Sequence, residues 1–332
     1  MKREIAPLLA LVVASVFTAC GGSGTPTGSP EPAPPRSPAP SPAPSPTPSP
    51  SPAPSPSPGP TPPVVSRVTF SCAFTGSPSD CGFTEQAKAP GRASILSPSI
   101  LDRVLASARV GTGRDESNAV RLHTEPGDSN VAGSLDAERN DLALSQKATD
   151  CYEGREQWWA HSILFPDDYV DPPPSTATTW TFATVFDFHN SNPGGGQANF
   201  QINAWPASAT LPDRPTGLAF QMAYGNQISP IVKSYPIGPV VRNAWYDFVY
   251  HVKWSSGADG TLTAWVNGAK KMEYTGPTLY AGQGCYLKLA NYHTPFGKPS
   301  SVIHDRVIRG TTAASVSLTP LEGIAPSPPG GS

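Results

Sequence analysis

The sequence predicts one large all-β domain, a sandwich or a barrel, between about residues 64 and 321. Valine, threonine and aromatic residues occur there in short runs, separated by Gly, Pro, Asn and Asp. Several of these runs alternate apolar and polar residues with period two, which is typical of half-buried strands. Helical periodicity is almost absent, and we expect one short helix near residues 100–108.

The residues before this domain predict export and tethering. A charged start at Lys2 and Arg3, an apolar run and the sequence FTAC predict a lipoprotein-type signal peptide over residues 1–20, which ends at an acylated Cys20. Plain secretion after an Ala–Cys cut is the alternative. Residues 21–63 are almost only Pro, Ser, Ala, Thr and Gly, so we expect a disordered linker. Residues 322–332 are expected to form a disordered tail.

These segments predict where the protein acts. A lipid on the N-terminal cysteine would anchor the chain to a membrane. We therefore expect an exported lipoprotein of the outer membrane or cell surface, or otherwise a secreted or periplasmic protein. The net charge of −2 gives no basic field for a polyanion, so we expect no nucleic-acid partner.

Five cysteines fit an exported protein. With Cys20 acylated, four remain for disulfides. Cys72 and Cys81 are close in sequence and are expected to pair, which leaves Cys151 for Cys285; the other pairings stay open. No cysteine or histidine spacing resembles a metal site, so no metal ligands are assigned.

Several predicted strands have one apolar face and one unusual polar face. Arginine, histidine, amide and aromatic side chains take the place of the Ser, Thr, Lys and Glu of an ordinary solvated sheet. Amides and guanidinium groups bind sugar hydroxyls and carboxylates, and aromatic rings pack on sugar rings. The predicted core side comprises Leu142, Leu144, Phe182, Phe186, Phe188, Phe200, Ile202, Leu218, Phe220, Met222, Leu287 and Leu289. The predicted polar side comprises Arg139, Asp141, Val185, Asp187, His189, Asn199, Gln201, Asn203, Trp205, Tyr286, Lys288 and Tyr292.

His189 is the leading candidate for acid–base chemistry. It ends a predicted strand just before a glycine-rich loop, and Asp187 on the same face can orient it or raise its pKa. A surface histidine with no catalytic role fits the same position. A glycoside hydrolase needs two carboxylates beside one bond, for which Asp141 and Asp187 are the candidate pair.

Six motifs, in order over residues 121–316, resemble the heparin lyase I and glucuronan lyase group of polysaccharide lyases. ERNDLALS resembles the arginine strand of that family, TVFDFHN the strand that ends in its histidine, and YLKLANYH its Tyr-x-Lys-x-Gly-x-Tyr strand. The other three motifs are WWAHSILFPDDY, the hairpin segment 242–276, and VIHDRVIRGTT. The chain departs from the family at Asn140, Asp141 and Ala290, and Gln86 is a candidate for the family's N-terminal glutamine.

This resemblance implies a concanavalin A-like β-jelly-roll sandwich with a concave substrate groove. It also implies β-elimination at a uronic acid in an acidic polysaccharide, with His189 as the base and Tyr292 as the proton-transferring tyrosine. Lys288 and Arg139 would be the cationic groups. The expected substrate-binding residues are Asn190, Gln201, Asn203, Trp205, Asp187 and Tyr286.

The modest net charge favours a glucuronan- or alginate-like substrate over a heavily sulfated one. The alternatives are a non-catalytic carbohydrate-binding jelly-roll module and a glycoside hydrolase on the same fold. We expect a monomer that requires no cofactor. A structural calcium ion is compatible with a sandwich, but no run of ligands identifies a site.

Overall fold

The computed structural model describes residues 65–87, 89, 91–97, 118–128, 137–176, 180–192, 195–207 and 214–325. The expected signal peptide, the linker and the helix near residues 100–108 lie outside these residues. The helices that are described are short: η1 (Pro78–Cys81), α2 (Gln146–Thr149) and η3 (Ala313–Ser315). No helix within the described ranges has the length and apolar character needed to cross a membrane.

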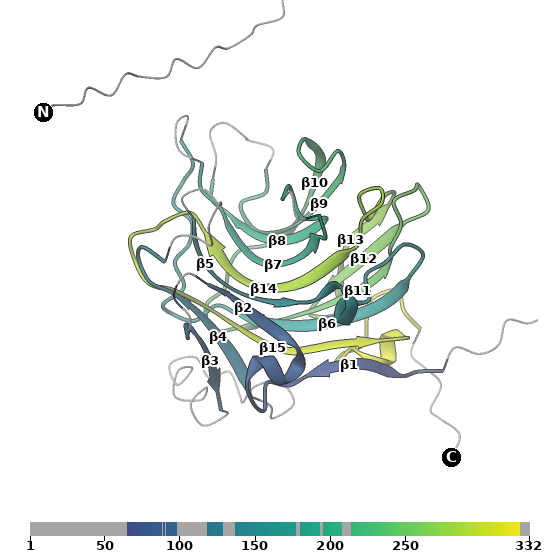
Figure 1. Ribbon diagram of the computed structural model, residues 1–332, viewed down its shortest axis with the longest axis horizontal. Helices are drawn as coiled ribbons and strands as arrows, with labels where there is room; N and C mark the ends of the chain where they lie inside the picture. Colours follow the sequence, from purple (N-terminus) through teal and green to yellow (C-terminus); the bar gives the residue numbers. More distant parts are fainter. Residues whose placement is uncertain are drawn as a thin grey trace, which may run out of the picture. The chain divides into compact units, whose positions relative to one another are not determined.

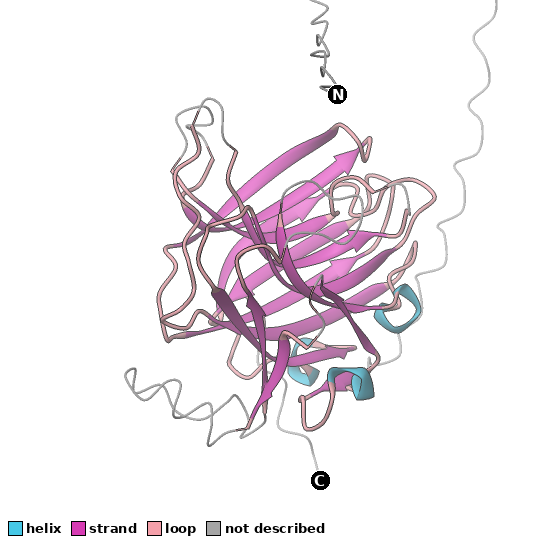
Figure 2. Cartoon of the chain, turned by 60° about the vertical axis from the view of Figure 1, so that its left-hand side comes forward, coloured by secondary structure: helices cyan, strands magenta, loops and turns pink. Residues whose placement is uncertain are grey.

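Two antiparallel sheets are stacked face to face, which confirms the all-β jelly-roll prediction (Figures 1 and 2). The seven-stranded sheet runs in the order β10 (Pro230–Gly238), β9 (Gly217–Gly225), β8 (Phe200–Trp205), β7 (Ala183–Asn190), β14 (Cys285–His293), β5 (Glu138–Leu144) and β2 (Phe83–Ala87). The eight-stranded sheet runs β13 (Ala269–Thr275), β12 (Thr261–Val266), β11 (Trp245–Lys253), β6 (Glu156–Leu164), β15 (Ser300–Gly310), β4 (Ala119–Thr124) and β3 (Ala93–Leu96), and β1 (Val68–Cys72) pairs with β15.

The core lies between the sheets and is rich in aromatic rings. Phe186, Phe188 and Phe200 of the seven-stranded sheet are fully buried against Phe248 and Tyr250 of the other sheet. Each such ring contributes about 1.5–3 kcal/mol of burial free energy. Because alternate residues of a strand face opposite sides, this packing turns the polar residues of β5, β7, β8, β9 and β14 to the other face of their sheet. We call it the outer face; its strands bow, so that it is concave (Figure 1).

A bulge in β7 changes which residues reach the core. In the pairing of β7 with β8, one extra β7 residue lies between Thr184 and Phe186. Val185 is therefore buried in the core, and Phe182 lies on the outer face with its ring 5.0 Å from that of Tyr292. The sequence analysis assumed unbroken alternation and was wrong about the faces of Val185 and Phe182.

Both expected disulfides are confirmed: Cys72 bonds to Cys81, and Cys151 bonds to Cys285. Gly284 lets the strand approach closely here, since a Cβ at this position would collide with the carbonyl oxygen of Cys151. At the C-terminal end, the indole nitrogen of Trp265 donates to the carbonyl oxygen of Glu322, at 2.9 Å. The ordered domain thus includes Glu322, which the sequence analysis assigned to the tail.

Candidate active site

Four charged side chains meet at the centre of the outer face. Lys288 of β14 has its Nζ 3.2 Å from Oδ2 of Asp187 on β7 and 3.4 Å from Oδ2 of Asp141 on β5. Asp141 is also 3.2 Å from Nε of Arg139. Burial alone would lower the pKa of Lys288, but the two carboxylates raise it, so the lysine is protonated at neutral pH. Burial raises the pKa of Asp141, and the charges of Lys288 and Arg139 oppose this shift. Two basic and two acidic side chains thus form one buried cluster.

One side of this cluster, the His189 end, holds His189 and Tyr286. These residues are directly opposite each other on β7 and β14, and their ring centroids are 5.2 Å apart. The Nδ1–H of His189 donates to the carbonyl oxygen of Asn190 at 3.0 Å, which leaves Nε2 as the basic nitrogen. Burial lowers the pKa of His189, and Asp187 offsets this only in part. His189 is therefore uncharged near pH 7.

The same end has a tyrosine suited to keeping its proton. Burial raises the pKa of Tyr286 above its usual value, and the nearby charge of Lys288 opposes this shift. Tyr286 is therefore a neutral phenol at neutral pH. His189 and Tyr286 together place a proton acceptor next to a proton donor.

The other side of the cluster, the Arg139 end, holds Arg139 and Tyr292. The two residues are opposite each other on β5 and β14, and the guanidinium carbon of Arg139 lies 4.1 Å from the centroid of the Tyr292 ring. Tyr292 is six residues from Tyr286 along β14, which corresponds to about 20 Å of strand. The structure therefore places His189 and Tyr292, the base and the proton-transferring tyrosine that the resemblance implies, at opposite ends of the outer face.

Amide side chains continue the polar surface across β8 and β9. Nε2 of Gln221 donates to Oε1 of Gln201 at 2.9 Å, and Nδ2 of Asn203 lies 3.4 Å from Oε1 of Gln221. The hydroxyl of Thr184 donates to Oδ1 of Asn203 at 2.7 Å. These bonds fix the orientation of each amide, as a site that recognises sugar hydroxyls requires.

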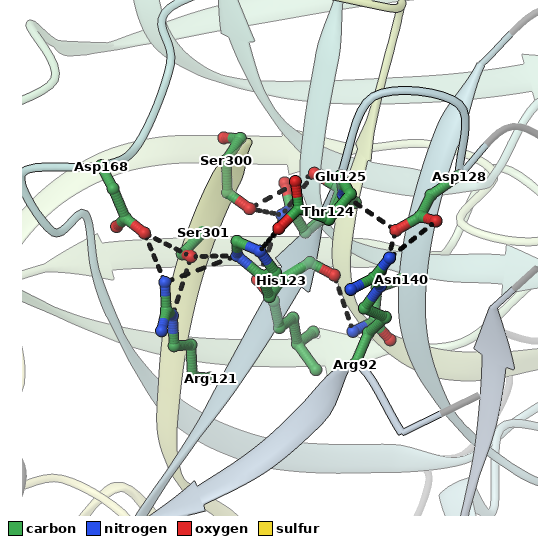
Figure 3. A network of polar contacts seen from close by, with 12 residues as sticks. Arg92, Arg121, His123, Thr124, Glu125, Asp128, Asn140, Asp168, Ser300 and Ser301 are labelled. Carbon is green, nitrogen blue, oxygen red and sulfur yellow. Dashed lines mark hydrogen bonds and ion pairs between the residues drawn. The ribbon is translucent and has the colours of Figure 1, made fainter. Parts of the chain in front are cut away.

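A polar network behind the sheet holds the start of β5 and the end of β14 (Figure 3). Asn140 of β5 donates from Nδ2 to the carbonyl oxygen of His123, at 3.1 Å. The Nε2–H of His123 donates to Oε1 of Glu125 at 2.9 Å, and its Nδ1 lies 2.9 Å from the hydroxyl oxygen of Ser301, which ties β4 to β15. Asn291 of β14 donates to the carbonyl oxygen of Ser300 at 3.0 Å. Because Asn140 and Asn291 adjoin Arg139 and Tyr292, this network positions both side chains.

One expected site residue has another role. Asn190 is buried, its Nδ2 donates to the carbonyl oxygen of Gln197 and its Oδ1 accepts from the backbone of Asn192, so its amide closes the loop after β7. Gln86 is opposite Asp141 in the pairing of β2 with β5, so it shares the outer face with that carboxylate. The outer face also gains residues that the sequence analysis did not assign to the site. These are Thr184, Phe182, Gln221, Trp180 and Arg214.

The missed residues differ in how they could have been found. Gln221 follows the same alternation as Gln201, so the period-two test applied fully to β9 would have identified it. Phe182 depends on the bulge, and Trp180 and Arg214 lie outside the strands. Within the described residues, no three His, Cys, Asp or Glu side chains are grouped so that they could hold a metal ion.

Comparison with known proteins places the chain in a family. No curated protein matches the sequence. Among solved structures, the endo-β-1,4-glucuronan lyase of Trichoderma reesei is similar with a TM-score of 0.51 and 18% identity, over 71% of this chain and 93% of that one. Alginate lyase Aly36B is similar with a TM-score of 0.37 and 14% identity, over 68% and 96% of the two chains. The polysaccharide lyase family model matches residues 106–308, which is more than half of the sequence, and the chain therefore belongs to the polysaccharide lyase family.

Proposed function

We propose that this protein cleaves a polysaccharide that contains uronic acid, by β-elimination. The observation that carries the proposal is an uncharged histidine on the outer face of a polysaccharide lyase, next to a neutral tyrosine and a buried charge cluster. Elimination requires a base, an acid and cationic or hydrogen-bonding groups that stabilise a developing charge. The outer face supplies all three.

The reaction removes the proton on C5 of the uronate and breaks the bond between C4 and the glycosidic oxygen. In our proposal, Nε2 of His189 takes the C5 proton, and its electron pair forms the C4–C5 double bond. The glycosidic oxygen leaves with the electrons of the broken bond and receives a proton from a tyrosine. Guanidinium or amide donors offset the charge on the uronate carboxylate, which otherwise makes the C5 proton very weakly acidic.

Two tyrosines compete for the acid role. An acid and a base that act on one sugar must each lie within hydrogen-bond reach of it, which favours Tyr286 because it is opposite His189. Tyr292 remains the second candidate because it has Arg139 stacked on its ring. In that arrangement Tyr292 acts as its phenolate, takes the C5 proton and then gives that proton to the leaving glycosidic oxygen, and Arg139 binds the carboxylate.

Lys288 has a supporting role in this proposal. Its ammonium group is engaged by two carboxylates and its side chain is only 3% exposed. It therefore acts through its neighbours: it neutralises Asp187 beside His189 and Asp141 beside Arg139. Lys288 is thus a positioning residue in our assignment.

The charges also bear on the substrate and on the alternatives. A chain with a net charge of −2 suits a glucuronan- or alginate-like polymer better than a heavily sulfated one. Asp141 and Asp187 are fully buried on one lysine, which weighs against a hydrolase that would use them on a bond. A binding module would need no uncharged histidine beside a neutral tyrosine.

The ultraviolet absorbance of the purified protein with glucuronan, alginate and a neutral glucan tests the proposal. Elimination leaves a double bond conjugated to the carboxylate, so absorbance rises with an acidic polymer and stays flat with the glucan. New reducing ends without absorbance would indicate hydrolysis. Binding without cleavage of any polymer would indicate a binding module.

We also propose that an acyl group on Cys20 tethers the enzyme to a membrane through the proline-rich linker. This follows from the signal-like start of the sequence and its FTAC box. Mass spectrometry of the mature N-terminus distinguishes an acylated Cys20 from an unmodified one.

A further inference from the structure

An arginine lies between two tryptophans next to the outer face. The guanidinium carbon of Arg214 is 4.5 Å from the ring centroid of Trp180 and 4.2 Å from that of Trp205. The two indole rings are 5.8 Å apart and meet edge to face. The planar cation is therefore held in one place by aromatic rings on two sides.

Among the residues that the structure describes, this guanidinium has no hydrogen-bond partner. All three nitrogen atoms of Arg214 are buried, and none of them bonds to a described residue. An arginine remains charged in proteins and carries five N–H donors, so leaving all of them unpaired in a buried position is unfavourable. Burial also lowers the pKa of Arg214. A planar anion that accepts two hydrogen bonds would complete this environment.

The surroundings fit a sugar better than a small inorganic anion. Trp180 is 49% exposed and offers a ring face on which a pyranose can pack. The indole Nε1 of Trp205 is buried without a partner, and it is a donor for a hydroxyl or carboxylate oxygen. The guanidinium of Arg214 and the indole Nε1 of Trp205 are thus two unpaired donor groups, and the exposed ring of Trp180 lies beside them.

This cluster adjoins the Arg139 end. Trp205 ends β8 and lies on the same face as Asn203, two residues before it. Asn203 accepts a hydrogen bond from Thr184, which is the residue opposite Tyr292 on β7. Neighbouring strands are about 4.8 Å apart, so β8 and β14 are separated by about 10 Å. A sugar at Arg214 is therefore within a short stretch of polysaccharide from Tyr292.

We propose that Arg214, Trp180 and Trp205 form a uronate-binding subsite, in which Arg214 pairs with the carboxylate of a sugar that flanks the cleaved bond. This inference rests on the proposed function for its substrate class. It makes Arg214 a determinant of specificity for acidic over neutral polymers. It assigns no chemical step to Arg214.

The test measures binding with the full-length protein by titration calorimetry, using a glucuronan oligosaccharide and the same oligosaccharide with its carboxyl groups reduced. We expect Arg214→Gln to weaken binding of the acidic oligosaccharide about ten-fold or more and to leave binding of the reduced one unchanged. Arg214→Lys keeps the charge but loses the paired donors, so it should recover affinity only in part. Lys233→Gln, which removes an exposed positive charge from β10, is the matched control.

Turnover provides a second readout. A subsite residue should raise KM in Arg214→Gln far more than it lowers kcat. If Arg214→Gln and Lys233→Gln bind the acidic oligosaccharide equally well, the inference is wrong, even if the protein proves to be a lyase. If binding depends on Arg214 but no polymer is cleaved, the subsite stands and the proposed elimination fails. Melting temperatures close to wild type establish that each variant is folded.

Discussion

The two ends of the outer face are built from the same three strands but are held in place by different means. At the His189 end, Cys285 adjoins Tyr286 and is bonded to Cys151. At the Arg139 end, the buried polar side chains of Glu138, Asn140, Asn291 and His293 alternate with the site residues. The His189 end is therefore fixed by a disulfide bond. The Arg139 end is fixed by buried side chains that form hydrogen bonds, and some of these side chains can bind or release protons. The two ends should therefore respond differently to mutation, reduction and acid.

Single substitutions should identify the end that carries the chemistry. We expect His189→Ala and Tyr286→Phe each to lower kcat by about 10²–10⁴-fold, because each would remove a proton-transfer group. Tyr292→Phe should have a smaller effect. Initial rates of absorbance increase measure this, with melting temperature as the control for folding. Full loss in Tyr292→Phe together with an active His189→Ala would move the chemistry to the Arg139 end.

The charge cluster couples the two ends, and its lysine should be essential for stability. Lys288→Met would leave Asp141 and Asp187 buried without their shared cation, which should lower the free energy of unfolding by about 3–5 kcal/mol. Urea unfolding measures the change. The triple variant with Asp141→Asn and Asp187→Asn should regain most of the loss, since it removes the unpaired charges. A Lys288→Met protein as stable as wild type would show that the lysine does not neutralise the pair.

The disulfide at the His189 end should stabilise the fold more than the N-terminal one. Cys151 and Cys285 are 134 residues apart, whereas Cys72 and Cys81 are 9 apart. The chain-entropy model gives the longer loop an advantage of about 2 kcal/mol. Unfolding of Cys151→Ala/Cys285→Ala and of Cys72→Ala/Cys81→Ala should show this difference. If both double variants lose the same free energy of unfolding, contacts in the native state and not loop closure determine how much each disulfide stabilises the fold.

Acid should weaken the Arg139 end. Burial lowers the pKa of His293 to about 4, although the hydrogen bond that its Nδ1–H donates to the carbonyl oxygen of Thr294 favours the protonated form. The unfolded chain binds that proton near pH 6.5, so the stability from His293 is complete above pH 6.5 and is lost as pH falls toward 4.

Between pH 6.5 and pH 4, His293 should lower the free energy of unfolding by about 1.4 kcal/mol per pH unit, or about 3 kcal/mol in total. Denaturant unfolding at several pH values should show a shallower pH dependence in His293→Asn than in wild type. An unchanged slope in His293→Asn would contradict the assignment.

Strand faces were the most predictable part of this molecule. Leu287 and Leu289 are buried and Lys288 is on the other face because a strand has a period of two, and the sequence displays that period directly. The β7 bulge was not predictable in this way. It arises from how β7 pairs with β8, so Phe182 and Val185 exchanged faces with no local signal.

The sequence predicted which residues lie on the outer face better than it predicted the distances between them. His189, Lys288, Arg139 and Tyr292 all lie on the outer face, as alternation required. Their distances depend on register, which no single strand encodes, so Tyr286 rather than Tyr292 came to lie beside His189. Arg214 was missed for a similar reason, because its contacts with Trp180 and Trp205 join three separate segments.

The position of β14 has a consequence for the order in which the enzyme is made. β14 lies between β5 and β7, although it begins at Cys285, whereas β5 ends at Leu144 and β7 at Asn190. Until residue 293 has emerged, β5 and β7 lack the strand that joins them, and Asp141 and Asp187 lack their lysine. The site is thus assembled late, by long-range pairing, which is the slow kind of folding step. A chain interrupted before β14 would contain most of the domain but would lack the proposed catalytic centre.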